Sequence, residues 1–138
     1  MHSNKESRSI NQLLGVPSEE VNEESGYLVK RVQQLLDKSI DAFNIEDYRI
    51  LINQNIALQY LLSPALDVLT NNIMAEGDYY EGDLLKSILT IDSSFWEKNI
   101  VLRDQFKTIC HSQFDTIKAL DLSSAVNESI YILVKRFL

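Results

Sequence analysis

The sequence is poor in the residues that usually build catalytic and metal sites. It has one cysteine, Cys110, and two histidines, His2 and His111, among 138 residues. A single cysteine cannot form an internal disulfide bond, which favours a reducing compartment. Adjacent residues on a helix do not face each other, so Cys110 and His111 are not expected to form a nucleophilic pair. Because Cys-x-x-Cys and His-Glu-x-x-His patterns are also missing, we expect no enzymatic activity and no metal, and interpret Cys110 as a small core residue.

Glycine is also scarce, which argues against phosphate-binding loops. The four glycines, Gly15, Gly26, Gly77 and Gly82, do not form a glycine-rich turn between a strand and a helix. The acidic run at 78–83 lacks the ligand spacing and closing glutamate of an EF-hand. We therefore expect neither a bound nucleotide nor a bound calcium ion, and no cofactor.

Long apolar runs and an excess of positive charge are missing too. No stretch approaches the ~18 apolar residues of a membrane span, and residues 1–8 are too polar for a signal peptide. We expect a cytoplasmic protein that does not bind membranes. Thirteen Lys and Arg against twenty Asp and Glu give a net charge of −7, which argues against a nucleic-acid partner and favours a basic protein partner.

What the sequence does contain is enough apolar material for one core, with 45% hydrophobic and 24% charged residues. Its acidity is concentrated between Ile73 and Asp92, where Lys86 alone opposes five carboxylates. These are Glu76, Asp78, Glu81, Asp83 and Asp92. The segment is either a solvated loop that includes a helix cap or a local negative patch with a binding role.

Apolar residues recur at helical spacing along most of the chain. The first clear stripe predicts a helix at 26–38, and the last, at 126–137, fits a helix better than a buried strand. No hairpin signal and no strict alternation of apolar and polar residues interrupts these stripes. We expect an all-α fold, a single compact domain of six or seven helices. Residues 1–24 are predicted to form a polar, mobile N-terminal segment and residues 25–138 a single helical domain.

Helix ends are predicted from polar residues that can bind free backbone N–H groups. Asn44 is expected to cap a helix whose first turn contains Glu46 and Asp47. Pro64 should begin a new helical segment or kink an existing one, because it has no backbone donor.

Two further caps are predicted downstream. Asp83 is expected to cap a short helix, and Ser94 with Glu97 fits a capping box.

The aromatic residues have two interpretations. Phe95 and Trp96 follow a capping signal and are either a core plug or an anchor for a partner. Tyr79 and Tyr80 are adjacent in an acidic loop, so both rings cannot point inward and one is expected to be exposed.

Four blocks, in this order, resemble the contact-dependent growth inhibition (CDI) immunity protein family. They are IEDYRILINQNIAL at 45–58, PAL at 64–66, EGDYYEGDLL at 76–85 and FW at 95–96. The resemblance covers about Ser9 to Lys98. The chain has Asn53 and Ala57 where the family pattern has glycines, and Glu81 where it has proline.

The resemblance implies a cytoplasmic, non-enzymatic protein that binds and neutralises the toxin domain of a CDI system. Such toxins are often nucleases, whose basic surfaces suit an acidic partner. The matching motif residues are expected mainly to build the scaffold: Glu46, Asp47, Arg49, Gln54, Gly77, Gly82, Asp83 and Trp96.

For the toxin-binding surface we predict Glu76, Asp78, Tyr79 and Glu81, because carboxylates steer a basic partner and a desolvated aromatic ring adds affinity. The alternative function is a helical adaptor or homodimerisation module that does not bind a toxin.

Overall fold

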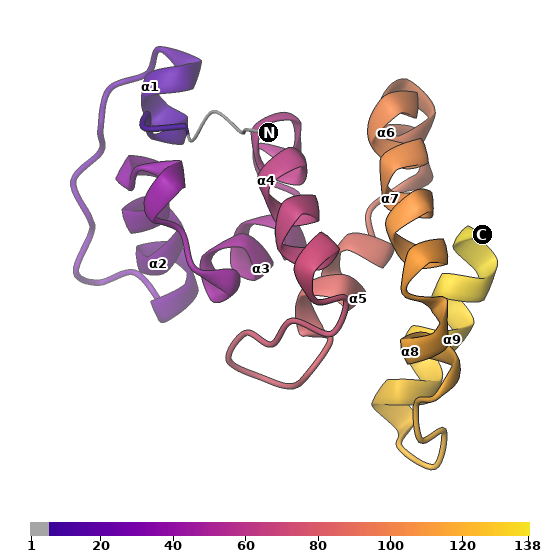
Figure 1. Ribbon diagram of the computed structural model, residues 1–138. Coiled ribbons are helices and arrows are strands. Elements are labelled where there is room, and N and C mark those ends of the chain that lie inside the picture. The colour runs from indigo at the N-terminus through magenta and orange to yellow at the C-terminus, as the bar shows by residue number, and fades with distance from the viewer. Residues whose placement is uncertain (1–5) are drawn as a thin grey trace.

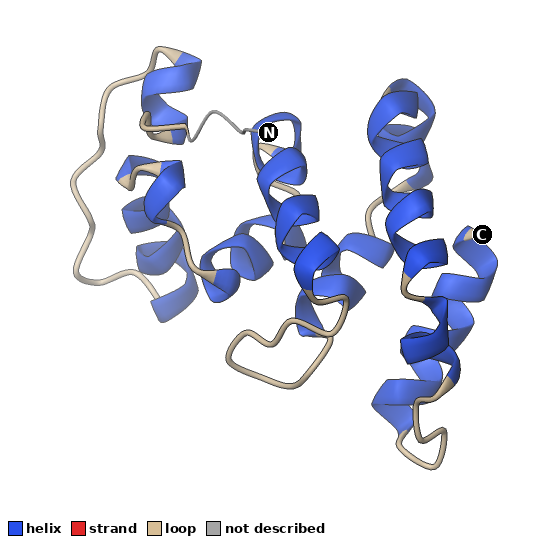
Figure 2. Ribbon diagram, viewed as in Figure 1, coloured by secondary structure: helices blue, strands red, loops and turns tan. Residues whose placement is uncertain are grey.

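Helices make up most of residues 6–138, the part of the chain that the computed structural model describes (Figure 1; Figure 2). In order they are α1 (Ile10–Leu14), α2 (Tyr27–Asp37), the 3-10 turn η1 (Ile40–Ala42), α3 (Ile45–Asn53), α4 (Leu58–Asn71), α5 (Asp83–Leu89), α6 (Ser93–Lys98), α7 (Ile100–Ser112), α8 (Phe114–Lys118) and α9 (Ala125–Phe137). Within the described residues, strand-like pairing is limited to two isolated bridges. The prediction of an all-α, single compact domain is confirmed. Among residues 6–138, six helices have seven or more residues, and α1, α6 and α8 are shorter.

The helices follow one another across the molecule, with α1 and α2 at one end and α6 to α9 at the other (Figure 1). Helix α3 packs against α4 and α5, while α4 contacts α7 and α5 contacts α9. Fully buried leucines lie on these central helices at Leu51, Leu61, Leu66 and Leu85. The centre of the molecule is therefore the main core, and both ends attach to it.

A short helix lies inside the segment predicted to be polar and mobile, of which residues 1–5 are outside the described part. The Ser9 side chain accepts a hydrogen bond from the Gln12 N–H, the Gln12 side chain accepts one from the Ser9 N–H, and Ile10 is fully buried. This reciprocal capping starts α1, which packs on α2. The boundary proposed between residues 24 and 25 stays a prediction.

The start of α3 agrees with the prediction. The Asn44 side chain accepts from the Asp47 N–H at 2.8 Å, and the Asp47 carboxylate accepts from the Asn44 N–H at 3.1 Å. This capping box also places Glu46 and Asp47 in the first turn of the helix, where their carboxylates meet the positive end of the dipole.

The connection between α3 and α4 uses two residues with left-handed backbone conformations, Asn55 (φ 61°) and Ala57 (φ 54°). Asparagine tolerates this conformation, whereas alanine pays a steric cost because its Cβ approaches the following carbonyl. Ala57 is one of the positions where the family pattern has glycine. The backbone geometry gives the physical reason for a glycine there.

Pro64 does not begin a helix, because α4 starts at Leu58 and continues through it. Buried side chains flank the proline on both sides, at Leu61, Leu62 and Ala65. Their packing in the core outweighs the loss of one backbone hydrogen bond in the middle of the helix.

Two predicted caps are wrong. The residue that precedes α5 is Gly82, with φ 88°, and the carboxylate of Asp83 turns away to bind the preceding loop. Helix α6 starts at Ser93, one residue before the predicted cap, because the Asp92 carboxylate accepts from the Ser94 N–H at 2.8 Å. Asp92 therefore supplies the side-chain cap that the local pattern assigned to Ser94, whereas α5 begins after Gly82 without a side-chain cap.

The C-terminal helices enclose an aromatic cluster. Trp96 is 4% exposed, stacks on Phe106 with ring centroids 5.6 Å apart, and meets Phe137 edge-on at 5.2 Å. Trp96 thus lies in the core, as the first interpretation of the Phe95–Trp96 pair held. Cys110 is also buried, and burial raises the pKa of its thiol to about 12.

Helices α7 and α8 are separated at Gln113, whose side chain donates to the Leu69 carbonyl and accepts from the Ile73 N–H. The last segment is helix α9, as predicted. Within residues 6–138, no helix has the length and apolar character that crossing a bilayer requires.

Candidate functional site

The acidic loop, residues 72–82, projects between α4 and α5 (Figure 1) and is held by two buried carboxylates. Asp83 accepts from the backbone N–H groups of Gly77 at 2.6 Å and Tyr79 at 3.1 Å. Glu46, on α3, accepts from the N–H of Asp78 at 3.0 Å. These hydrogen bonds hold the backbone of the loop in one conformation, so the positions from which its exposed side chains project are fixed.

Arg49 joins the two carboxylates. Its guanidinium forms a bidentate pair with Glu46, with both N–O distances at 2.6 Å, and its Nε lies 3.9 Å from the Asp83 carboxylate. The hydrogen bond from Arg49 is the largest cause that lowers the pKa of Glu46, and the same bond raises the pKa of Arg49. Both charged forms are thus favoured in the folded protein.

The same arginine also supports the exposed tyrosine. Tyr79 is 70% exposed, and the Arg49 guanidinium lies 4.4 Å from its ring centroid. A cation against an aromatic face restrains the ring without covering its other side. Tyr80 is only partly exposed, so the expectation of one exposed ring is confirmed.

The geometry of the loop explains why glycine occupies both position 77 and position 82. A Cβ at Gly77 would lie 2.5 Å from the Glu46 carboxylate and 3.0 Å from that of Asp83. At Gly82 the backbone has φ 88°, and a Cβ would lie 2.7 Å from Met74. Glycine at 77 lets the backbone approach the carboxylates, and glycine at 82 permits the left-handed turn into α5.

Asp47 holds the adjacent region together. Its side chain is 0% exposed and pairs with Arg31 at 2.7 Å and Lys38 at 2.6 Å. These contacts connect α3 to α2 and to the chain that follows α2. Gln54 is exposed at the end of α3, without a packing role comparable to that of Asp47.

The predicted toxin-binding residues lie together on this loop. Glu76, Asp78, Tyr79 and Glu81 are all exposed, whereas Asp83 is buried beneath them. A bridge between Glu76 and Glu81 brings the two ends of the turn side by side. We call these four residues the acidic surface.

The structure adds an apolar depression that the sequence did not reveal. A pocket of about 390 Å³ beside the loop is lined by Glu76 and Asp78 and by apolar side chains of earlier segments, including Phe43, Ile45 and Val68. Apolar walls beneath carboxylates suit the aliphatic stem and charged head of a lysine or arginine. Sequence reasoning missed these residues because Phe43 and Val68 are 25 positions apart.

A model of the CDI immunity proteins matches residues 12–106. The chain belongs to this family of CDI immunity proteins. The match covers more than half of the chain and includes α3, the acidic loop and the Glu46–Arg49–Asp83 cluster. No curated protein and no solved structure matches the chain significantly.

This match confirms the resemblance to the family that the four sequence blocks indicated. A CDI immunity protein neutralises the toxin of its system, so a cognate toxin is the partner that membership implies. The match ends at Phe106 inside α7, which leaves α8 and α9 beyond it.

Proposed function

We propose that this CDI immunity protein neutralises a basic, nuclease-type toxin by binding it through the acidic surface of residues 76, 78, 79 and 81. The observation that carries the proposal is the way in which buried groups hold an exposed acidic turn. Carboxylates of Glu46 and Asp83 bind its backbone, and Arg49 supports Tyr79, while the acidic side chains face outward.

A restrained surface favours binding because less conformational entropy is lost when a partner docks. The exposed carboxylates would accelerate the approach of a basic toxin, and Tyr79 would supply apolar contact once water is displaced. The depression beside Phe43 offers room for a basic side chain of the toxin. Inhibition follows if the bound protein covers the surface with which a nuclease holds its nucleic acid.

The first test is complex formation with the toxin domain encoded by the gene immediately upstream. Co-expression followed by purification should yield a stable complex, and the purified toxin should degrade RNA or DNA until the immunity protein is added. The immunity protein alone should degrade neither. A toxin fragment that fails to co-purify at micromolar concentrations would contradict the proposal.

The second test separates local charge from net charge. The double variant Asp78→Lys/Glu81→Lys should associate with the toxin about tenfold more slowly at low ionic strength, and its rate should depend less on salt. Glu19→Lys/Glu20→Lys is the matched control, because both residues are exposed in the segment between α1 and α2 and the net charge changes equally. Equal slowing by both variants would mean that overall charge, rather than the acidic surface, directs the encounter.

A further inference from the structure

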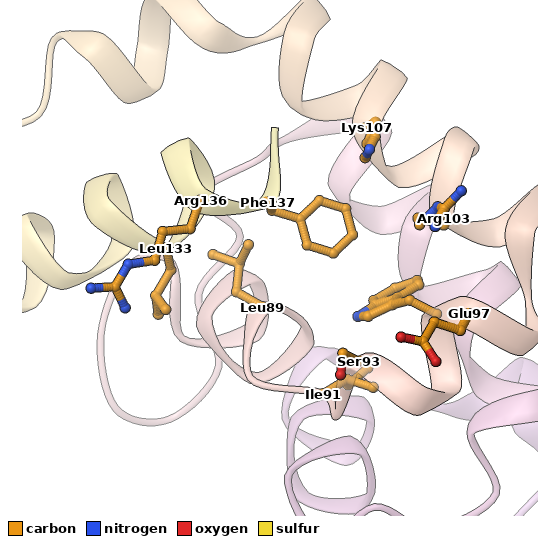
Figure 3. Close-up of a pocket in the computed structure, with 10 residues that line it drawn as sticks. Leu89, Ile91, Ser93, Glu97, Arg103, Lys107, Leu133, Arg136 and Phe137 are labelled. Carbon is orange, nitrogen blue, oxygen red and sulfur yellow. The ribbon is translucent and has the colours of Figure 1, made fainter.

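A second pocket lies at the other end of the molecule, where α5, α6, α7 and α9 meet (Figure 3). Its volume is about 380 Å³. Leu89, Ile91, Leu133 and Phe137 give it apolar walls, and Arg103 and Lys107 come from α7 on the opposite side of Phe137 from Leu133 (Figure 3). This pocket shares no lining residue with the acidic surface.

The charge of this pocket is opposite to that of the whole protein. Its lining includes the basic residues Arg103, Lys107 and Arg136 and one carboxylate, Glu97. The guanidinium of Arg136 is directed past Leu133, away from Phe137 (Figure 3), so Arg103 and Lys107 supply the positive charge. Among residues 6–138, neither Lys107 nor Arg136 has a carboxylate within 4 Å, and the nearest to Arg103 is its neighbour Asp104 at 4.0 Å. Glu97 is exposed and forms no ion pair with any of them within the described part of the chain.

Two buried donors at this pocket have no acceptor among the described residues. The indole Nε1–H of Trp96 and the Nε–H of Arg103 are both buried, and within residues 6–138 neither has a hydrogen-bond partner. Trp96 itself is 4% exposed. A buried donor without an acceptor is costly, so a wall with two of them is suited to a ligand that brings oxygen acceptors.

We propose that this pocket binds a small organic carboxylate with an apolar body. The carboxylate would accept from Arg103 and Trp96 and lie near the Lys107 ammonium, while the apolar body would contact Leu89 and Phe137. A carboxylate satisfies unpaired N–H donors and neutralises adjacent cations at once, and the aliphatic and aromatic walls favour a ligand with more apolar surface than a bare inorganic anion.

The test uses 3-phenylpropionate as the probe. Trp96 is the only tryptophan in the chain, so its fluorescence and its single indole N–H resonance both report on this pocket. The probe should change the fluorescence saturably and shift the indole N–H signal. At matched ionic strength, the neutral 3-phenylpropanol and inorganic phosphate should each bind at least about tenfold more weakly.

Matched variants identify the cations responsible. The variant Arg103→Gln/Lys107→Gln should bind 3-phenylpropionate about tenfold more weakly, or weaker still. The control Lys98→Gln/Lys118→Gln removes the same charge outside the pocket and should leave the affinity for 3-phenylpropionate unchanged. Equal binding of 3-phenylpropanol, tighter binding of phosphate, no saturable change, or full affinity of the Arg103/Lys107 variant would each overturn the proposal. The indole shift in the unaltered protein decides the question even if that variant does not fold.

The same variants keep this inference separate from toxin binding. The Arg103/Lys107 variant should associate with the toxin like the unaltered protein, because its changes lie outside the acidic surface. Loss of probe binding with intact toxin binding supports a separate carboxylate site. If this variant lost toxin binding while remaining folded, the pocket would belong to the toxin interface, and its separation from toxin binding would be overturned.

Discussion

Basic side chains are used differently in the two halves of this molecule. In the N-terminal half, the basic residues whose ion pairs fall within the described chain are Arg8, Lys30, Arg31, Lys38 and Arg49. From residue 93 onward there are six basic side chains, and among the described residues only Arg103 has a carboxylate within 4.0 Å. The charge of −7 is thus a sum over two unlike regions.

The comparison shows that pairing, rather than composition, decides which charges reach the surface. Around the acidic loop, Arg49 and its partners are buried together, so the charges left outside are carboxylates. Around the second pocket, Lys107 and Arg136 have no carboxylate within 4 Å among the described residues, and Arg103 has only Asp104 at 4.0 Å, so a local positive site results within an acidic protein. Variants in the two regions should therefore differ in stability and in their response to pH.

The largest effect is expected from Asp83→Ala. It leaves the N–H groups of Gly77 and Tyr79 without their acceptor and removes one carboxylate from Arg49. We expect a loss of about 3 kcal/mol in the free energy of unfolding, measured by urea denaturation.

The control for that variant lies in the other region. Asp121→Ala removes an exposed carboxylate that also accepts a backbone N–H, from Ser123. Its unfolding midpoint should stay close to that of the unaltered protein. Equal losses in both variants would show that burial of Asp83 does not distinguish the acidic-loop region.

Acidification should weaken the loop before it disturbs the aromatic cluster. Hydrogen bonding from Arg49 keeps the pKa of Glu46 below its ordinary value of 4.5. A lowered pKa in the folded state contributes stability that is present above 4.5 and lost as the pH falls through the folded value. Protection of the Asp78 amide, corrected for intrinsic exchange, should therefore fall below about pH 4.5 while Trp96 fluorescence stays native.

The variant Glu46→Gln shows whether the Glu46 carboxylate causes this pH dependence of the Asp78 amide. Its Asp78 amide should be less protected at neutral pH, and protection should change little on acidification, because the titrating carboxylate is gone. Persistent pH dependence of the same size would assign the effect to another group.

The smallest expected effect is a gain in stability. Ala57→Gly should stabilise the protein by about 0.5 kcal/mol, because relief of the left-handed strain at φ 54° exceeds the entropy lost by glycine. In the other region, Ala125 lies in the first turn of α9 with helical geometry, so Ala125→Gly should destabilise. Thermal denaturation of both variants measures the opposite signs.

Much of the helical framework could be predicted from local patterns. The stripe at 26–38 became α2, the cap at Asn44 was confirmed, and the final segment is a helix because its apolar spacing has the helical period. The assignments that failed, at Asp83 and Ser94, were also local. A capping rule considers only the next few residues, whereas the Asp83 carboxylate binds a loop that folds back over it.

By itself, the sequence determined the all-α class, the family and the acidic, exposed character of residues 76–81, because periodicity, ordered motifs and charge are properties of neighbouring positions. Only the tertiary structure decided that Glu46, Arg49 and Asp83 hold that loop together. It also decided that Trp96, Arg103 and Arg136 share one pocket, since these contacts join helices α6, α7 and α9. Packing of the core sets such distances, and packing depends on all the helices at once.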